Sequence, residues 1–161
     1  MVFIALYSKF KKCEGKMIRK ITESDKSEYL KMADEFYSSE AVSHSIPKEY
    51  FVNAFNEAIK GSPFIELYIL EQEGVAAGYA AVAVTFTTEG GGKTLWLDEL
   101  YIREQFRGKG LGRSVLKYFQ SDKSVKRIRL EITPDNKGAE RLYKSEGFEV
   151  CEYKQMIFEN V

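Results

Sequence analysis

Three alternating glycines, Gly108, Gly110 and Gly112, mark the segment that most constrains the fold. The apolar run Leu95–Ile102 before them predicts a buried strand, and the apolar spacing over Leu111–Phe119 predicts a helix directly after them. Glycine lets the backbone turn where other residues are strained, so the strand can pass into the helix through a short loop. The sequence therefore predicts a strand–turn–helix unit within a mixed α/β domain.

Patterns in the rest of the chain predict further strands and helices. Apolar alternation predicts strands over residues 17–21, 64–70, 75–86, 127–132, 148–152 and 153–158, and helical spacing predicts helices over 29–37, 47–59 and 136–146. This order predicts one mixed α/β domain, with a central, mostly antiparallel twisted sheet flanked by about four helices. Residues 17–161 form this domain, and residues 1–16 are expected to be an N-terminal extension or an extra edge strand.

The composition argues against several classes of protein and site. Lys and Arg total 24 and Asp and Glu total 24, which argues against a surface adapted to nucleic acid or to an anionic membrane. No apolar run reaches the roughly 18 residues of a membrane span. One histidine and two cysteines, Cys13 and Cys151, leave little for a structural zinc site, so we expect no metal. So few cysteines also indicate a reducing compartment, and we expect a cytoplasmic protein.

The glycine loop is suited to bind a phosphate group. Its glycines let a ligand approach the backbone, and the first amides of the following helix are unpaired donors at the positive end of the helix dipole. Arg107, Lys109 and Arg113 add positive charge around it. Together these features predict a pyrophosphate site, and the alternative is a plain tight turn between strand and helix.

The spacing of the glycines does not match the two common nucleotide motifs. A Walker P-loop has four residues between its glycines and then Lys-Ser/Thr, whereas three residues separate Gly108 from Gly112 and Arg113 follows. A dinucleotide fingerprint reads G-x-G-x-x-G early in a βαβ unit, whereas this loop reads G-x-G-x-G late in the chain. Both of these classes therefore fit poorly.

Two stretches resemble motifs of the GNAT superfamily of N-acetyltransferases. Residues 105–110 read Q-x-x-G-x-G, similar to the family's acyl-coenzyme A loop, and residues 136–148 read N-x-x-A-x-x-L-Y-x-x-x-G-F, similar to its second conserved stretch. The order of predicted elements from Met17 onward also agrees with that fold. The resemblance implies a single GNAT-like domain that uses acetyl-CoA as co-substrate and no metal.

The resemblance also implies which residues contact acetyl-CoA. It places the amide of Leu100 against the thioester oxygen and lets the backbone of residues 100–102 pair with the pantetheine arm. It adds a polar contact from Asn136, which otherwise serves as a helix N-cap. The implied cofactor-binding residues are Leu100, Tyr101, Ile102, Arg107, Gly108, Lys109, Gly110, Leu111, Gly112, Arg113, Asn136 and Tyr143.

Acetyl transfer to an amine needs a base for the ammonium proton and an acid for the departing thiolate. Asp98 and Glu99 are adjacent on the strand where the family often places its base, and at most one of them points into the cleft unless the strand bulges. The resemblance implies such a bulge, which separates this strand from its parallel neighbour and admits the pantetheine arm. We favour Glu99 and keep Asp98 as the alternative. Tyr143 occupies the family's general-acid position, and a phenol pKa of about 10 suits a thiol leaving group. The alternative without a catalytic role is that Asp98 and Glu99 are solvated carboxylates at a strand edge and that Tyr143 is a buried aromatic residue of a helix.

The end of the first predicted helix supplies candidates for the acceptor site. Glu35, Phe36, Tyr37 and Glu40 are acidic and aromatic residues that suit a cationic amine, although helix packing explains the aromatic pair equally well. The lone His44 follows them, and an exposed loop position is its simpler interpretation.

We therefore expect an acetyl-CoA-dependent N-acetyltransferase that acts directly on a small cationic amine, such as a polyamine or an amino sugar. The alternatives are acetylation of a protein N-terminus or lysine, and a coenzyme A sensor without turnover. The expected partner is a small-molecule amine, without nucleic acid or membrane. The closing strand Tyr153–Phe158 offers an edge for pairing two copies, so the sequence also allows a homodimer.

Overall fold

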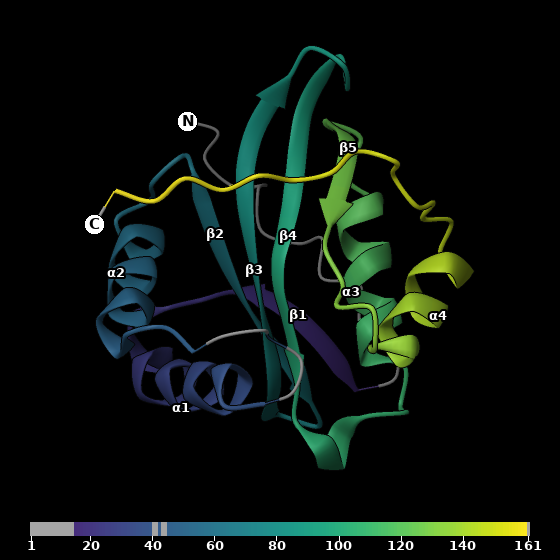
Figure 1. Cartoon of the computed structure of the whole chain (residues 1–161). Coiled ribbons are helices and arrows are strands. Elements are labelled where there is room, and N and C mark those ends of the chain that lie inside the picture. Colours follow the sequence, from purple (N-terminus) through teal and green to yellow (C-terminus); the bar gives the residue numbers. More distant parts are fainter. Residues whose placement is uncertain (1–14, 40–41, 43–44, 161) are drawn as a thin grey trace, which may run out of the picture.

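The computed structural model describes residues 15–39, 42 and 45–160, which contain one five-stranded sheet in the order β1-β2-β3-β4-β5 (Figure 1). The strands are β1 (Lys16–Lys20), β2 (Ile65–Gln72), β3 (Val75–Thr87), β4 (Gly92–Ile102) and β5 (Val125–Leu130). The helices are α1 (Lys26–Tyr37), α2 (Lys48–Ile59), α3 (Leu111–Gln120) and α4 (Lys137–Ser145), with short 3-10 segments η1 (Glu23–Asp25) and η2 (Glu104–Phe106). Neighbouring strands are antiparallel except for β4 and β5. The predicted mixed α/β domain is confirmed.

Helices pack on both faces of the sheet, because the central strands carry apolar side chains on both faces. Met32 of α1 and Phe55 of α2 lie in the core on one face, and Val115 and Leu116 of α3 lie in the core on the other. Alternate residues of a strand face opposite ways, so the run Leu67–Leu70 in β2 is buried throughout. Removal of this apolar surface from water is the main favourable contribution to folding.

The start of the described chain belongs to the fold. β1 begins at Lys16, and the carbonyl of Gly15 accepts the amide of Glu73 at 2.8 Å. Arg19 of β1 forms ion pairs of 2.7 Å with Asp25 and with Glu71, which join η1 to the sheet. The rest of the expected extension, residues 1–14, lies outside the described residues.

β4 contains a β-bulge at Asp98. The register of β3 and β4 shifts between Ala81 and Val82, and Asp98 is the residue of β4 that has no partner. β4 pairs with β5 only as far as Leu97, which lies opposite Leu130. In the described chain, the part of β4 beyond Leu97 therefore has no strand on its β5 side, and the sheet opens there.

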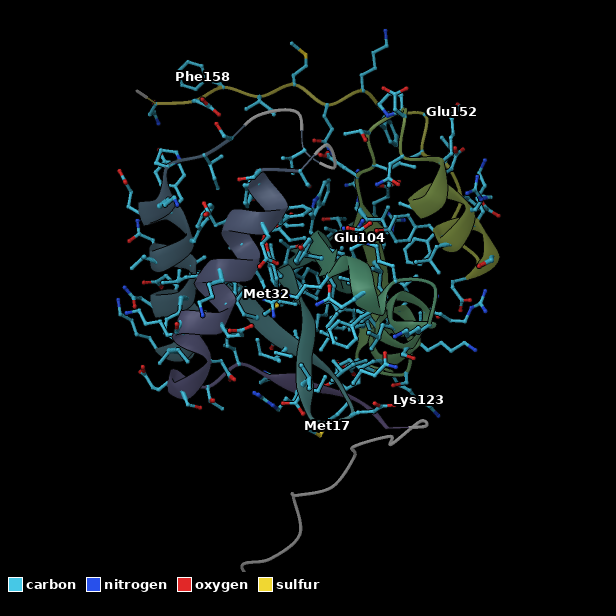
Figure 2. All side chains as sticks on the ribbon, turned by 90° about the horizontal axis from the view of Figure 1, so that it is seen from below. Met17, Met32, Glu104, Lys123, Glu152 and Phe158 are labelled. Atoms are coloured by element: carbon cyan, nitrogen blue, oxygen red, sulfur yellow. The ribbon has the colours of Figure 1, made fainter. Side chains whose placement is uncertain are left out.

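The chain beyond α4 runs as an extended segment, which we call the C-terminal arm (Glu149–Asn160). The predicted closing strands at 148–152 and 153–158 are wrong, since both stretches are irregular in the structure. Figure 1 shows the arm, in yellow, crossing from α4 toward α2, and Figure 2 shows Glu152 and Phe158 along it at one margin of the molecule. The arm has no backbone hydrogen bond to the other described residues, and a strand requires such bonds from a neighbour.

Candidate active site

Glu99 follows the bulge and points to the sheet face that α1 covers. The Tyr37 hydroxyl, at the end of α1, donates to Oε1 of Glu99 at 2.7 Å, and the Tyr79 hydroxyl, from β3, donates to Oε2 at 2.5 Å. Burial raises the pKa of Glu99, and the two hydrogen bonds partly oppose that shift. A carboxylate that is fixed at both oxygens and has a raised pKa is well prepared to accept a proton.

Asp98 is the exposed neighbour of Glu99 at the bulge. Partial loss of water around its carboxylate raises the pKa of Asp98 to about 6, and repulsion from Glu99 and Glu131 adds to the shift. A regular strand separates adjacent side chains onto opposite faces. At the bulge, the charge of Glu99 still acts on the carboxyl of Asp98 and contributes to its raised pKa.

Glu35, a predicted acceptor residue, is already paired within the chain. Arg103 donates to both of its carboxylate oxygens at 3.1 and 3.2 Å, and the Tyr101 hydroxyl donates to Oε2 at 2.9 Å. The hydrogen bonds from Arg103 lower the pKa of Glu35. The positive guanidinium also compensates the charge of Glu35, which leaves Glu35 less available to a cationic ligand.

The other predicted acceptor residues divide into three kinds. Phe36 is 8% exposed and packs in the core, so the helix-packing interpretation fits it. Tyr37 stacks on Phe51 with ring centroids 5.1 Å apart, and its hydroxyl reaches Glu99. Glu40 and His44 lie outside the described residues.

The glycine loop has the backbone geometry of an anion cradle. Gly108 and Gly110 have φ angles of +72° and +81°, a region that other residues rarely adopt. The Ser114 amide makes the first hydrogen bond of α3, to the Gly110 carbonyl at 3.1 Å, so the earlier amides of α3 lack a helical acceptor. A Cβ at Gly108 has no atom within 4 Å, which leaves space beside the loop. These residues fit a diphosphate group.

The three basic side chains near the loop differ in whether they are already bonded to other groups of the chain. The Arg107 Nε donates to the Ile102 carbonyl at 2.8 Å, and the Arg113 Nε bonds to Glu146 of the α4 terminus at 2.5 Å. The Lys109 ammonium lies 5.5 Å from the centre of the Phe106 ring and has no ion pair with another described residue. Lys109 therefore carries the freest positive charge at this loop.

Asn136 begins α4 as its N-cap. Its Oδ1 accepts the amide of Ala139 at 3.0 Å, which confirms the capping interpretation. The further contact to a cofactor stays a prediction.

Tyr143 of α4 lines a cavity of about 840 Å³ beside β5 and the C-terminal arm. Its ring lies 5.8 Å from that of Phe148, burial raises the pKa of its phenol, and its hydroxyl has no hydrogen bond to another described residue. Trp96 of β4 lines the same cavity, and the Arg129 guanidinium lies over its ring at 4.6 Å. Tyr143 and Glu99 thus lie on opposite sides of the sheet, with the unpaired end of β4 between them.

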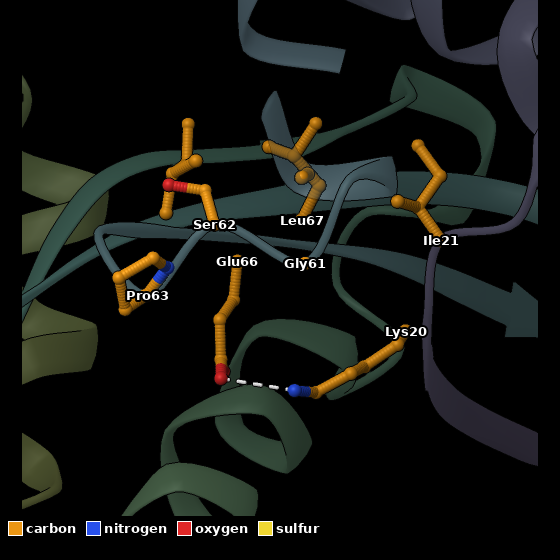
Figure 3. A pocket seen from close by; sticks show the side chains of 9 residues that line it. Lys20, Ile21, Gly61, Ser62, Pro63, Glu66 and Leu67 are labelled. Atoms are coloured by element: carbon orange, nitrogen blue, oxygen red, sulfur yellow. Dashed lines mark hydrogen bonds and ion pairs between the residues drawn. The ribbon is translucent and has the colours of Figure 1, made fainter. Parts of the chain in front are cut away.

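A second, smaller cavity of about 250 Å³ lies between the end of α2 and strands β1 and β2 (Figure 3). Lys20 and Glu66 form an ion pair of 2.9 Å at its edge, and the Tyr68 hydroxyl also donates to Glu66. None of the predicted site residues lines this cavity.

A family profile identifies the chain. Residues 26–148 match the profile described as "Acetyltransferase (GNAT) family". The chain belongs to the GNAT family. This N-acetyltransferase has no helix in its described part that is long and apolar enough to cross a bilayer. Its described residues also contain no group of three or more metal-ligating side chains.

Two relatives in sequence and one solved structure with a similar fold are informative. A thialysine N-epsilon-acetyltransferase from Mus musculus is 26% identical over 141 residues, which cover 79% of this chain and 80% of the relative. A spermine/spermidine N(1)-acetyltransferase from Bacillus subtilis is 41% identical over 59 residues, which cover 34% of this chain and 39% of the relative. AAC(6')-Iy in complex with a CoA-based bisubstrate analogue has a TM-score of 0.73 at 15% identity, covering 91% of this chain and 99% of that one. This structural likeness shows the fold.

Two residues of the site were missed by sequence reasoning. Tyr79 lies in β3, opposite Tyr101, and only the strand register brings it to Glu99. Trp96 precedes the bulge in β4, and its place on the cavity depends on where β5 ends. The alternation of apolar residues in β3 and β4 indicated their faces, but it did not indicate which strands pair.

Proposed function

We propose that this acetyltransferase moves the acetyl group of acetyl-CoA directly to the primary amine of a small cationic metabolite, a polyamine or an amino sugar. The observation that carries the proposal is Glu99, a carboxylate with raised pKa held by Tyr37 and Tyr79 next to the unpaired end of β4. The glycine loop leads from that strand end into α3, so a phosphate cradle and a base occur on one continuous segment.

Binding of the co-substrate rests on the backbone. The free amides at the start of α3 and the Lys109 ammonium would hold the diphosphate, and the backbone of β4 from Leu100 to Ile102 would pair with the pantetheine arm. Acetyl-CoA, when bound, supplies a thioester whose carbonyl is the electrophile. The Leu100 amide would stabilise negative charge on that carbonyl oxygen.

Deprotonation of the amine is assigned to Glu99. An alkylammonium has a pKa of about 10.4, so the acceptor arrives charged and must lose a proton before it attacks. Glu99 takes up that proton, directly or through water, and Tyr37 and Tyr79 keep its oxygens in place. Asp98, with a pKa of about 6, contributes negative charge that attracts the cation and is the alternative base.

Departure of coenzyme A is assigned to Tyr143. As the carbon–sulfur bond breaks, the Tyr143 hydroxyl donates its proton to the departing thiolate, and the new carbon–nitrogen bond remains in the amide product. The attacking nitrogen releases its second proton in this step, and that proton returns through water to the Tyr143 phenolate. Burial keeps this phenol protonated until then, because it raises the pKa. We infer that the transfer is direct, because Cys151 lies outside both family motifs and has no histidine near it in the sequence to activate it as a nucleophile.

The acceptor class rests on charge and on relatives. Asp98, Glu99 and Glu131 place negative charge around the opening between β4 and β5. The relatives are named for thialysine and for spermine or spermidine, which are amines, and the structural neighbour was solved with an acetylneamine analogue. These names support a small amine acceptor.

The test measures coenzyme A release from acetyl-CoA by chromatography, with polyamines, aminoglycosides, amino acids and short peptides as acceptors. Chromatography avoids thiol dyes, which react with exposed Cys151. Turnover with polyamines or aminoglycosides, strongly reduced in Tyr143→Phe, is the expected result. Turnover with peptides alone would replace the small amine by a protein acceptor. Tight binding of acetyl-CoA without any turnover would make the protein a sensor.

A further inference from the structure

Arg103, the first residue after β4, joins the end of that strand to α1. Its side chain is only 15% exposed. The guanidinium donates to Glu28, to both carboxylate oxygens of Glu35 at 3.1 and 3.2 Å, and to the Ala76 carbonyl of β3 at 3.3 Å. Charge-assisted hydrogen bonds that are partly shielded from water are stronger than those of exposed ion pairs. Arg103 therefore attaches α1 firmly to the sheet.

The two carboxylates that bind Arg103 lie on one face of α1. Glu28 and Glu35 are seven positions apart, which is about two turns of an α-helix. Between them, Met32 packs in the core, but hydrophobic contact is not directional and resists a small slide of the helix only weakly. Hydrogen bonds to two turns of the helix are directional. Arg103 therefore sets the position of α1 along its own axis.

The end of α1 carries Tyr37, two positions beyond Glu35. The Tyr37 hydroxyl donates to Oε1 of Glu99 at 2.7 Å. A slide of α1 by about 1 Å would lengthen this contact beyond the range of a hydrogen bond. Tyr101, two positions after Glu99 in β4, also donates to Glu35, at 2.9 Å. The same turn of α1 is thus bonded to the part of β4 that holds Glu99.

We infer that Arg103 is a positioning residue, which sets the position of α1 and thereby keeps the Tyr37 hydroxyl on the Glu99 carboxylate. Among the described residues, no hydrogen bond or ion pair joins Arg103 to Glu99, so the effect passes through the helix. The consequence for catalysis rests on the proposed function, in which Glu99 is the base. The placement of the Tyr37 hydroxyl does not rest on it.

The groups around Glu99 determine the sign of the expected effect. Burial raises the pKa of Glu99, and the hydroxyls of Tyr79 and Tyr37 lower it. The other titratable groups that interact with its charge are Tyr29 of α1 and Asp98 of β4. Loss of the Tyr37 hydrogen bond removes an interaction that favours the carboxylate, so the pKa of Glu99 should rise. A hydrogen bond to a charged group corresponds to about one pH unit.

The first experiment titrates Glu99 by NMR in protein labelled with carbon-13 at the glutamate carboxyl, and Glu99→Gln identifies the signal. In Arg103→Gln, the pKa of Glu99 should rise by about one pH unit. The double variant Glu28→Gln/Glu35→Gln removes the same ion pairs from the side of α1 and should give the same rise. These two variants change the net charge in opposite directions, so a rise in both cannot come from charge alone. Circular dichroism checks that each variant is folded.

Arg19→Gln is the matched control. Arg19 is also a partly buried arginine (24% exposed) with two carboxylate partners, Asp25 and Glu71, each at 2.7 Å. These partners lie in η1 and β2, so Arg19 does not hold the end of α1 that carries Tyr37. Its loss should leave the pKa of Glu99 unchanged. An equal rise in Arg19→Gln would mean that any loosening of the fold has this effect, and it would contradict a specific role of Arg103.

The second experiment combines Arg103→Gln with Tyr37→Phe, which removes the hydroxyl itself. If Arg103 acts through that hydroxyl, the pKa of Glu99 in the combined variant should equal its pKa in Tyr37→Phe alone. Shifts that add would mean that the guanidinium influences Glu99 by another route, and they would overturn the inference. An unchanged pKa of Glu99 in Arg103→Gln would overturn it as well.

The acidic limb of the pH–rate profile separates this inference from the proposed function. Where Glu99 is the base, the limb in Arg103→Gln moves to higher pH together with the NMR titration. A shifted NMR titration with an unmoved limb would support the positioning role and remove Glu99 from the reaction. A limb that matches the titration of Glu99 in the wild type, without any shift in Arg103→Gln, would overturn the positioning role and leave the proposed base in place.

Discussion

Polar side chains on the two sides of the sheet differ in whether they have hydrogen-bond partners within the chain. On the side of α1, Glu99 has a hydroxyl at each carboxylate oxygen, and Glu35 is bonded by Arg103 and Tyr101. On the side of β5, the hydroxyl of Tyr143 has no partner among the described residues, and the outer strand edge is open. On the α1 side these polar groups are hydrogen-bonded within the chain. On the β5 side the unbonded groups are available to other molecules.

The largest expected effect on kcat comes from removing the proposed base, Glu99, on the side of the sheet that α1 covers. Glu99→Gln keeps the size and the hydrogen-bonding shape but cannot take a proton, so kcat should fall about 10²–10⁴-fold. The matched control is Glu66→Gln, since Glu66 also accepts a tyrosine hydroxyl but lies at the other cavity. Steady-state kinetics with the best acceptor would check both. An unchanged kcat in Glu99→Gln would transfer the role to Asp98.

On the open side, Tyr143→Phe should lower kcat about 100-fold, as loss of a general acid does. The variant should melt at nearly the wild-type temperature, because the Tyr143 hydroxyl makes no hydrogen bond with the described residues. Single-turnover kinetics and thermal unfolding together test this contrast. Slow chemistry in a protein of normal stability supports the acid, whereas a large loss of stability would make Tyr143 a structural residue.

Tyr79→Phe should behave in the opposite way to Tyr143→Phe. It leaves Oε2 of Glu99 without its donor in a buried position, which should cost about 1–3 kcal/mol in the free energy of unfolding. Because the Tyr79 hydrogen bond lowers the pKa of Glu99, its loss should raise that pKa and move the acidic limb of the rate profile to higher pH. Urea unfolding and a pH–rate profile measure the two effects.

A suitable comparison for Tyr79→Phe is Tyr118→Phe, a half-buried tyrosine that contacts Tyr68 and Phe119 through its ring. Tyr118→Phe should change neither the free energy of unfolding nor the acidic limb of the pH–rate profile. Equal stability losses in both variants would contradict the special role of the Tyr79 hydroxyl.

Glycine substitutions test how tightly each side is packed. A Cβ at Gly78 of β3 lies 2.2 Å from the Tyr101 carbonyl oxygen, a backbone atom, so Gly78→Ala should destabilise by about 1–3 kcal/mol. A Cβ at Gly112 of α3 lies 2.8 Å from Cδ2 of Leu142, the end of a flexible side chain, so Gly112→Ala should cost less. Denaturant unfolding gives both values, and a reversed order would mean that α3 and α4 are the more rigid pair.

The smallest expected effect is the pH dependence from Asp98. Its carboxyl is ionised above its pKa of about 6 and becomes neutral as the pH falls through that value. Attraction for a cationic amine is then lost, so KM should rise up to about fivefold below pH 6, as for one charge pair near water. In Asp98→Asn, KM should be high at every pH and lack this step. A step that persists in the variant would assign the titration to Glu99.

Local features of the site could be predicted from the sequence, because they depend on residues close together in the chain. The left-handed turns at Gly108 and Gly110 follow from glycine spacing, and the capping of α4 by Asn136 follows from its position before the helix. The family resemblance implied a bulge in this strand, but its position at Asp98 follows from the pairing of β3 with β4. One sequence does not determine the register of two strands.

Distant contacts could not be predicted in this way. Tyr37 and Glu99 are 62 positions apart, and their hydrogen bond exists because α1 packs across β3 and β4. The closing strands were expected because residues 148–158 alternate suitably, but alternation does not provide the neighbour that a strand needs. Glu35 was taken as free charge, since nothing in its local sequence indicates Arg103.

Trp96 gives the protein an optical reporter at the open side. It is the single tryptophan of the chain, it lines the cavity, and the Arg129 guanidinium covers its ring. Indole emission depends on the charges and water around the ring, so all tryptophan fluorescence of this protein originates from one place. Filling of the cavity, whether by a ligand or by another chain, should therefore change the emission spectrum without any added label.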